Sequence, residues 1–339
     1  MRWDAYHHHK FPVRREDQVG ELRRLIAENL HASGFDEQQI ARAGLVVTEI
    51  AKNLLKHTEK GGEILYRTRQ CNGRRELEVI SLDRGPGISN ISLAMQDGFS
   101  TAGSPGIGLG TIQRNVDAFE IFSRPGAGTA ILVRMWKSTS DGEADEEPFA
   151  VGGVAVPASG ETCSGDGWFY HHRPGELTVA VVDGLGHGEK AKEAATRALE
   201  TFSQCHAQPL SEILAEMNLA CRGTRGAAAG VARINTAEQH IRFAGIGNIS
   251  ASVVAPDGMK KGIPSINGIL GMHAGQIPEQ TAVWHPGNYL VMHSDGLLNR
   301  WDGKWIVQRP RELTLKAALM YRDFGKGHDD ATVLIAKLR

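Results

Sequence analysis

A polar, acidic segment divides the chain and limits how it can fold. Residues 137–147 read KSTSDGEADEE, which is typical of an exposed linker between domains. The segment separates about 136 residues from about 190, and both are ordinary domain sizes. Because a chain of 339 residues is expected to hold two domains, we assign residues 1–136 to one domain, 137–148 to the linker and 149–339 to the other.

The composition excludes several classes of protein. Lys plus Arg is 38 and Asp plus Glu is 39, and this balance argues against a nucleic-acid arm or a polybasic membrane anchor. The start has no apolar signal region and no stretch approaches about 18 apolar residues, so we expect a cytoplasmic protein without membrane spans. Cys71, Cys163, Cys205 and Cys221 form no CxxC pair, which argues against a zinc knuckle or a disulfide scaffold. The histidine run 7–9 could bind a metal, but it lies on an apparent first strand, and we interpret it as surface histidines or as residues added to the chain.

Residue periodicity predicts an α/β domain in the first part. Apolar residues recur at helical spacing over 17–31 and 36–57, and the second of these helices carries a buried stripe. A short strand opens this part, a short helix is expected near 110–118, and further strands are predicted at 62–70, 76–82, 118–122 and 129–135. We expect the helices on one face of an antiparallel or mixed sheet.

The second part reads as a sandwich of sheets covered by helices. Strands are predicted at 150–157, 167–171, 177–182, 227–234, 240–246, 250–254, 288–293 and 331–338. Helices are predicted at 189–206, 210–221 and 312–321. Two neighbouring helices among many strands indicate layered sheets with helices outside.

A polar row and a carboxylate in the first part suggest a binding cleft. Glu49, Asn53, Lys56 and His57 lie at i, i+4, i+7 and i+8, which places them along one face of the second helix. Asp83 directly follows a predicted strand. Each feature alone is more typical of a solvated helix face or of a turn.

Glycines complete the pattern. Gly85 and Gly87 follow the carboxylate and let the backbone pass close to a flat ligand. Gly106, Gly108 and Gly110 open a helix, where backbone N–H groups suit phosphate oxygens. A dinucleotide fingerprint is the rival interpretation, but it requires a preceding strand and an acidic residue about 20 positions later. The three motifs in this order are far more specific than any one of them.

These motifs resemble the GHKL ATP-binding fold, and more closely the RsbT-type anti-sigma-factor serine kinases. The run DRGPGISNISLAMQDGFSTAGSPGIGLGTIQRNVDAFEI carries the resemblance, which extends over residues 17–134. It implies a GHKL (Bergerat) α/β sandwich that binds ATP and Mg²⁺. It also implies roles at the phosphate end of the nucleotide: Asn53 would bind Mg²⁺, Glu49 would act as a general base or orient water, and Lys56 would contact the phosphates. At the adenine end, Asp83 would bind the amino group, Gly85 and Gly87 would lie at the adenine base, and Thr129 would support this end. The ATP lid would be formed by Gly106, Gly108 and Gly110.

A histidine kinase is the main rival within this fold. It would need a helical dimerisation segment with a phosphoacceptor histidine, and the region before Asp36 is too short for one. His31 is typical of an ordinary helix-terminal residue. A gyrase- or Hsp90-like machine would need long C-terminal transducer segments. Transfer to a serine of a separate protein therefore fits better.

Acidic residues at strand ends form the second pattern. Apolar strands lead into Asp183 and Asp295, each followed by glycine. Asp166, Asp329 and Asp330 lie in two further acidic segments. One Asp-Gly pair is usually a turn, but four acidic segments favour a metal site. Oxygen ligands without Cys or paired His suit Mg²⁺ or Mn²⁺, and two such ions can clamp a phosphate and activate water.

The order of these segments resembles the PPM/PP2C protein phosphatases in their SpoIIE/RsbX-like bacterial branch, over residues 149–338. The resemblance implies an αββα sandwich and two ions of Mn²⁺ or Mg²⁺. It implies metal ligands at Asp183 (bridging), the Gly184 carbonyl, Asp295 and Asp329, with Asp166 acting on the metal-water shell. The histidine of the motif is displaced to His187 in DGLGHG, which leaves the general acid open between this residue and another group. Asp330 is either a ligand or a neighbour that orients Asp329, and no arginine stands out for the substrate phosphate.

Together the two resemblances imply a bifunctional enzyme. The first part would phosphorylate Ser or Thr of a STAS-domain regulator, and the second would remove the phosphate, in a bacterial partner-switching pathway that controls a sigma factor or another output. The alternative is an ATP-dependent partner-binding module, with little kinase activity, that regulates the attached phosphatase. The sequence leaves the partner and the oligomeric state open.

Overall fold

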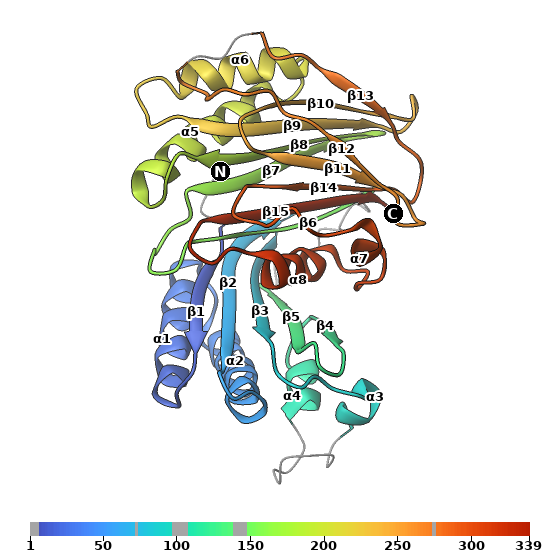
Figure 1. Ribbon diagram of the computed structural model, residues 1–339. Coiled ribbons are helices and arrows are strands. Elements are labelled where there is room, and N and C mark those ends of the chain that lie inside the picture. The colour runs from blue at the N-terminus through green and yellow to red at the C-terminus, as the bar shows by residue number, and fades with distance from the viewer. Residues whose placement is uncertain (1–6, 72–73, 97–107, 138–147, 273–275) are drawn as a thin grey trace. The chain divides into compact units, whose positions relative to one another are not determined.

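The computed structural model describes residues 7–71, 74–96, 108–137, 148–272 and 276–339. Contacts divide these residues into two compact units (Figure 1). Residues 9–137 form the first unit, and residues 148–339 form the second together with His7 and His8. The predicted acidic linker lies almost entirely outside the described residues.

The histidine run divides between the two units. The backbone N–H of His8 donates to the carbonyl of Ala155 at 2.9 Å, and the His8 residue is only 2% exposed. His9 begins the first strand of the first unit, where its ring stacks on Tyr66. The interpretation of this run as surface residues is therefore wrong for His8.

The first unit is an antiparallel sheet with helices on one face. Its elements are β1 His9–Val13, α1 Asp17–Ala32, α2 Glu37–His57, β2 Gly62–Cys71, β3 Arg74–Asp83, α3 Ile91–Ala94, α4 Gly108–Arg114, β4 Ala118–Ser123 and β5 Thr129–Trp136. The strand order is β1-β2-β3-β5-β4, and every neighbouring pair is antiparallel. This arrangement confirms the predicted helix-on-sheet architecture.

The helices form where the sequence supplies both a start signal and an apolar stripe. Asp36 and Gln39 make a capping box at the N-terminus of α2, in which each side chain bonds the other residue's backbone N–H. Ile50 and Leu54 of α2 pack in one core with Val79 of β3 and other buried residues. The short helix α4 is Gly108–Arg114, and Ala118 already begins β4, so the helix predicted near 110–118 extends four residues too far at its C-terminal end.

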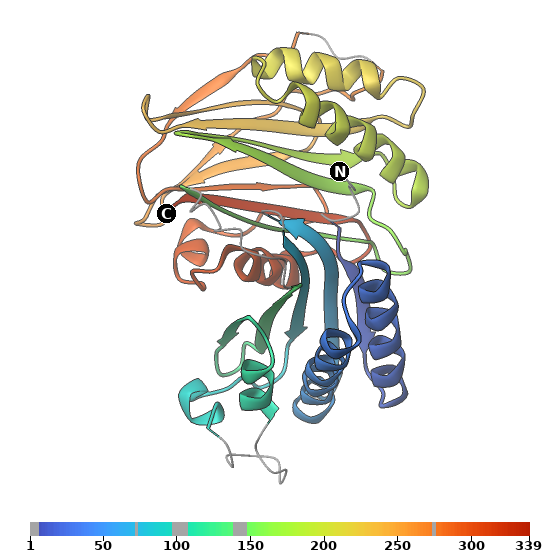
Figure 2. The same cartoon turned by 180° about the vertical axis from the view of Figure 1, so that it is seen from behind.

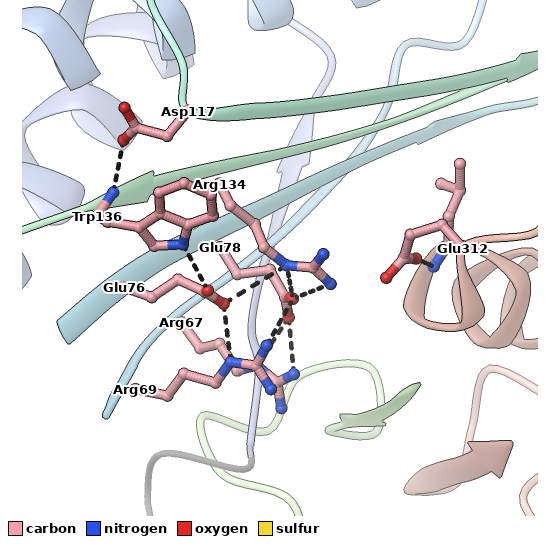
Figure 3. Close-up of polar contacts among 9 residues, drawn as sticks. Arg67, Arg69, Glu76, Glu78, Asp117, Arg134, Trp136 and Glu312 are labelled. Carbon is pink, nitrogen blue, oxygen red and sulfur yellow. Dashed lines mark hydrogen bonds and ion pairs between the residues drawn. The ribbon is translucent and has the colours of Figure 1, made fainter. Parts of the chain in front are cut away.

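The face of this sheet opposite the helix-covered core carries a buried ion-pair network (Figure 3). Glu78 accepts hydrogen bonds from the Nε atoms of Arg67 at 2.8 Å and Arg134 at 2.9 Å. Glu76 accepts from Arg69 at 2.8 Å and from the indole of Trp136 at 2.9 Å. Alternation along the strands places these charged residues on one face, and antiparallel pairing brings opposite charges together.

The second unit holds two sheets and four helices in the described residues. Its elements are β6 Phe149–Val156, β7 Asp166–Arg173, β8 Glu176–Gly184, α5 Glu189–Cys205, α6 Leu210–Ala220, β9 Ala227–Asn235, β10 His240–Ile246, β11 Ser250–Val254, β12 Lys260–Ile263, β13 Gln280–Val283, β14 Tyr289–His293, α7 Gly303–Val307, α8 Leu313–Phe324 and β15 Ala331–Leu338. The strand orders are β13-β10-β9-β8-β7 and β12-β11-β14-β15-β6.

These sheets stack as the inner layers of an αββα sandwich. Side chains such as Val179 of β8 and Leu334 of β15 form the core between the sheets. Alternate residues of β8, such as Val182, point instead into a second core with α5 and α6, which cover that sheet (Figure 2). Helix α8 packs on β6 and β15 of the other sheet. The predicted sandwich is confirmed, and none of the helices in the described residues is long and apolar enough to cross a membrane.

Candidate functional site

In the first unit, the polar row of α2 meets the start of α4. Glu49 and Asn53 are half-buried at the border of the apolar stripe, and Lys56 is exposed. A Cβ atom added at Gly108 would lie 3.4 Å from both Glu49 Oε2 and Asn53 Oδ1. The glycine therefore keeps the N-terminus of α4 close to these two side chains without covering them. Gly110 is buried in α4, and Gly106 lies outside the described residues.

Asp83 organises a second group of predicted residues at the end of β3. Its Oδ1 atom accepts hydrogen bonds from the backbone N–H groups of Gly85 at 2.7 Å and Thr129 at 3.0 Å. Gly87 has a φ of +74°, and a Cβ atom there would lie 2.0 Å from the carbonyl oxygen of Arg124. These contacts hold the carboxylate of Asp83 in a fixed orientation, as recognition of an amino group on a flat base requires.

The two groups adjoin at the C-terminus of α2. A Cβ atom on Gly85 would lie 2.8 Å from the carbonyl oxygen of His57. The structure thus brings the α2 row, the α4 start and the Asp83 group into one region of the first unit. This arrangement suits a nucleotide whose adenine base lies at Asp83 and whose phosphates reach Lys56 and the N-terminus of α4.

In the second unit, two carboxyl groups face each other across neighbouring strands. Asp166 of β7 and Asp183 of β8 are direct partners in the antiparallel register. Burial, and then repulsion from Asp183, raises the pKa of Asp166 well above its ordinary value. Burial, and then repulsion from Asp295 and Asp329, raises the pKa of Asp183 to about 7. These carboxyl groups are therefore close enough to repel one another in a poorly hydrated place.

The remaining predicted acids lie on two loops that touch. A Cβ atom on Gly296 would lie 1.9 Å from the carbonyl oxygen of Asp330, so the loop after β14 packs directly on the loop before β15. The amide of Asn248 donates to Asp295 Oδ2 at 2.7 Å. Asp329 is half-buried beside these residues, and its Oδ1 accepts from the backbone N–H of Asp330 at 3.0 Å.

Both carboxylate oxygens of Asp330 accept hydrogen bonds from backbone N–H groups. Oδ1 accepts from the N–H of Ala158 and Oδ2 from the N–H of Gly165, each at 2.7 Å. Gly165 in turn accepts at its carbonyl from the N–H of Gly184 at 3.0 Å. The carboxylate of Asp330 therefore fixes the loop that leads into Asp166, a contact that differs from both roles left open by the sequence, metal ligand and orientation of Asp329.

The residues fit a divalent cation. Asp166 Oδ2 is buried and has no hydrogen-bond partner, and the surrounding carboxylates repel one another, so a bound cation would relieve both costs. In the described part of the chain, no three His, Cys, Asp or Glu side chains are placed to enclose an ion by themselves. Mg²⁺ suits such an open set because it keeps several water ligands.

His187 has an acidic partner on another loop. Its Nδ1 atom lies 2.6 Å from Glu161 Oε1, and the side chain remains 61% exposed. A carboxylate at Nδ1 favours the tautomer that carries the proton there and leaves Nε2 for other contacts.

Comparisons with known proteins agree with both parts of the structure. The histidine kinase-like ATPase domain family matches residues 11–135, and the stage II sporulation protein E family matches residues 173–339. Serine/threonine-protein kinase RsbT of Bacillus subtilis is 36% identical over 116 residues, which cover 34% of this chain and 84% of RsbT. The chain belongs to the RsbT kinase family and carries a SpoIIE-type phosphatase domain.

The phosphatase domain is also similar to phosphoserine phosphatase RsbX of Bacillus subtilis. That protein is 28% identical over 138 residues, which cover 41% of this chain and 69% of RsbX. A crystal structure of RsbX in complex with magnesium has the same fold, with a TM-score of 0.52, 24% identity and coverage of 58% of this chain and 98% of that one. Both resemblances inferred from the motifs are therefore confirmed.

Several partners in the phosphatase domain could not be predicted from the sequence. Glu161 was visible as an acid, but only the fold places it against His187. Asn248 had no signal in the sequence, because its contact with Asp295 joins two loops that are far apart along the chain. An arginine also lies near the predicted metal-binding loop: Arg225 Nη1 would be 2.9 Å from a Cβ atom on Gly186.

Proposed function

We propose that the chain is a bifunctional switch: an ATP-dependent protein serine/threonine kinase joined to a metal-dependent protein serine/threonine phosphatase. The proposal rests on one observation above all: the first unit brings Gly108 to Glu49 and Asn53, and the second sets Asp166 opposite Asp183. The similarity to a serine kinase and to a phosphoserine phosphatase supports it. By analogy with these relatives, we propose a STAS-domain phosphoprotein as substrate, in a cytoplasmic partner-switching pathway.

In the kinase-like domain, catalysis would be mostly positioning and charge stabilisation. The carboxylate of Asp83 would accept a hydrogen bond from the adenine amino group. Glu49 would accept the proton of the attacking hydroxyl or orient it, and Lys56 would offset the charge of the phosphates. Asn53 would hold Mg²⁺ beside them, which supplies further charge neutralisation when it is bound.

In the phosphatase domain, Asp183, the Gly184 carbonyl, Asp295 and Asp329 would hold two ions of Mn²⁺ or Mg²⁺, with Asp166 beside them. When bound, these ions lower the pKa of a coordinated water and polarise the phosphate. His187, which contacts Glu161 through Nδ1, would pass a proton to the leaving serine oxygen, directly or through water. Asp330 maintains the loop that carries Asp166.

The test separates the two activities within the full chain. A STAS-domain protein is supplied in unphosphorylated form with Mg-ATP, or in serine-phosphorylated form with Mn²⁺, and phosphate on the serine is followed by mass spectrometry. Glu49→Ala should abolish phosphorylation only, and Asp183→Ala should abolish dephosphorylation only.

Exposed acids on the same units provide the controls. Glu37→Ala, at the other end of α2, and Asp257→Asn, in the turn after β11, should leave both activities within about twofold of wild type, because surface substitutions have small effects. If neither Glu49→Ala nor Asp183→Ala changes phosphate transfer in its direction, the bifunctional proposal fails. A stable ATP-dependent complex without phosphorylation would favour the partner-binding alternative.

A further inference from the structure

Arg225 lies where the strand that carries Asp183 ends. Strand β9 pairs with β8 so that Ala228 opposes Asp183 and Ala227 opposes Gly184. The N–H of Leu185 continues this ladder by donating to the carbonyl of Gly226 at 3.0 Å. Arg225 precedes Gly226, and it therefore lies opposite the DGLGHG loop that follows Asp183.

The guanidinium group of Arg225 approaches that loop at a glycine. A Cβ atom on Gly186 would lie 2.9 Å from Arg225 Nη1, which is closer than side-chain carbons normally come. Gly186 has a φ of +84°, so both the backbone conformation and the space favour glycine there. The loop thus leaves room for the guanidinium beside its own backbone.

The turn that carries Arg225 is held from several sides. Thr224 Oγ1 donates to the carbonyl of Cys221 at 2.6 Å and accepts from the N–H of Gly226 at 3.0 Å. Gly226 has a φ of +87°, and a Cβ atom on it would lie 2.7 Å from the carbonyl oxygen of Leu270. The backbone on both sides of Arg225 is therefore fixed, although its side chain is exposed.

The positive charge has no acidic partner in the described part of the chain. The arginines of the first unit's network are paired with Glu76 and Glu78, and Arg233 is paired with Glu176. Arg225 makes no such ion pair or side-chain hydrogen bond among the described residues, although Asp183 and its neighbouring acids lie at the same end of the sheet. Its planar fork of donors matches two oxygens of a phosphate group.

We propose that Arg225 binds the phosphate of the phosphoserine substrate and orients it over the carboxylate cluster. This inference rests on the proposed phosphatase function and adds a substrate-binding residue to it. Binding is bidentate: two guanidinium N–H groups donate to two phosphate oxygens. Because the cation is fixed at its backbone and open to solvent, a phosphorylated loop of another protein can reach it.

The test uses the full chain with Mn²⁺, p-nitrophenyl phosphate as substrate and inorganic phosphate as competing product. Arg225→Ala should lower kcat/KM by about 10- to 100-fold, as expected when a charged hydrogen-bonding group is lost. The inhibition constant of inorganic phosphate should rise by a similar factor. Isothermal titration of phosphate into the Mn²⁺-loaded protein gives a second readout that needs no turnover.

Two matched variants separate charge recognition from a structural effect. Arg222→Ala removes an exposed arginine from the same turn and should leave all three measurements within about twofold, as is usual for surface substitutions. Arg225→Lys keeps the charge without the fork and should recover only part of the phosphate affinity. Added guanidinium ion should partly restore the kcat/KM of Arg225→Ala and should not change that of Arg222→Ala.

An active wild type whose Arg225→Ala variant keeps the wild-type phosphate inhibition constant overturns the role of Arg225 and leaves the phosphatase proposal intact. Loss of phosphate binding accompanied by an equal loss in Arg222→Ala, or by a lower melting temperature, also overturns it, because the effect is then structural. A wild type that hydrolyses neither p-nitrophenyl phosphate nor a phosphoserine peptide refutes the proposed function itself.

Discussion

Replacing Asp183 by asparagine should stabilise the metal-free protein as the pH rises. Burial, and then repulsion from Asp295 and Asp329, raises the pKa of Asp183 to about 7 from an ordinary value of 3.8. A carboxyl group whose pKa is higher in the folded state favours folding while it is protonated. Its contribution is therefore complete below about pH 4 and is lost as the pH rises through 7. Asparagine cannot ionise and escapes this loss.

The size of the effect follows from the shift in pKa. The difference between 7 and 3.8 is about three units, and at about 1.36 kcal/mol per unit the upper limit is about 4 kcal/mol. Even about 1 kcal/mol would raise the melting temperature by about 2–4 °C in a domain of this size.

Thermal unfolding of the full chain in EDTA at pH 5, 6.5 and 8 measures the effect. The asparagine variant should melt above wild type by a margin that grows across this series. Mn²⁺ should raise the melting temperature of wild type most at pH 8, where the carboxylates are ionised, and should do little for the variant. Asp257→Asn is the control and should follow wild type. A variant that melts below wild type at pH 8 in EDTA, or a margin independent of pH, would refute the reasoning.

Three further substitutions test other contacts. Glu78→Ala leaves the buried cation of Arg67 without its carboxylate and should lower the free energy of unfolding of the first unit by about 3–5 kcal/mol, whereas Glu78→Gln should lower it less. Urea unfolding followed by circular dichroism measures this, and equal stabilities of wild type and Glu78→Ala would contradict it. Asp83→Asn should weaken binding of a fluorescent ATP analogue by about tenfold or more, because an amide presents a donor where the adenine amino group needs an acceptor, and an unchanged affinity would argue against the base site. Asp330→Asn should lower the melting temperature even in EDTA, since an amide nitrogen cannot accept from Ala158 or Gly165; a loss seen only with Mn²⁺ present would make Asp330 a ligand instead.

Much of the secondary structure could be predicted because local periodicity encodes it. The helices at 17–31 and 36–57 and the strand at 331–338 were predicted within a residue or so of the observed elements. Short elements such as β12 and β13 were missed, because four residues at a sheet edge leave too little alternation to detect. The predicted boundary between α4 and β4 was wrong for a related reason, since a brief apolar run fits the period of a helix as well as that of a strand.

The candidate sites were predictable to the extent that they lie at element ends. Asp183 and Asp295 follow apolar strands, and Glu49 and Asn53 share a helix face, so spacing along the chain singled them out, and the family resemblance supplied the roles proposed for them. The role of Asp330 was not predictable, because its hydrogen bonds reach Ala158 and Gly165 over 172 and 165 residues.

The sequence by itself determined the two families, the layers of each unit and the residue types available for chemistry. Only the tertiary structure decided which of them meet: Glu161 with His187, Arg225 with Gly186, and His8 with the edge of β6. The physical reason is that backbone periodicity fixes the direction of each side chain locally. Which distant side chain it faces depends on strand order and register, and packing of the whole chain sets these.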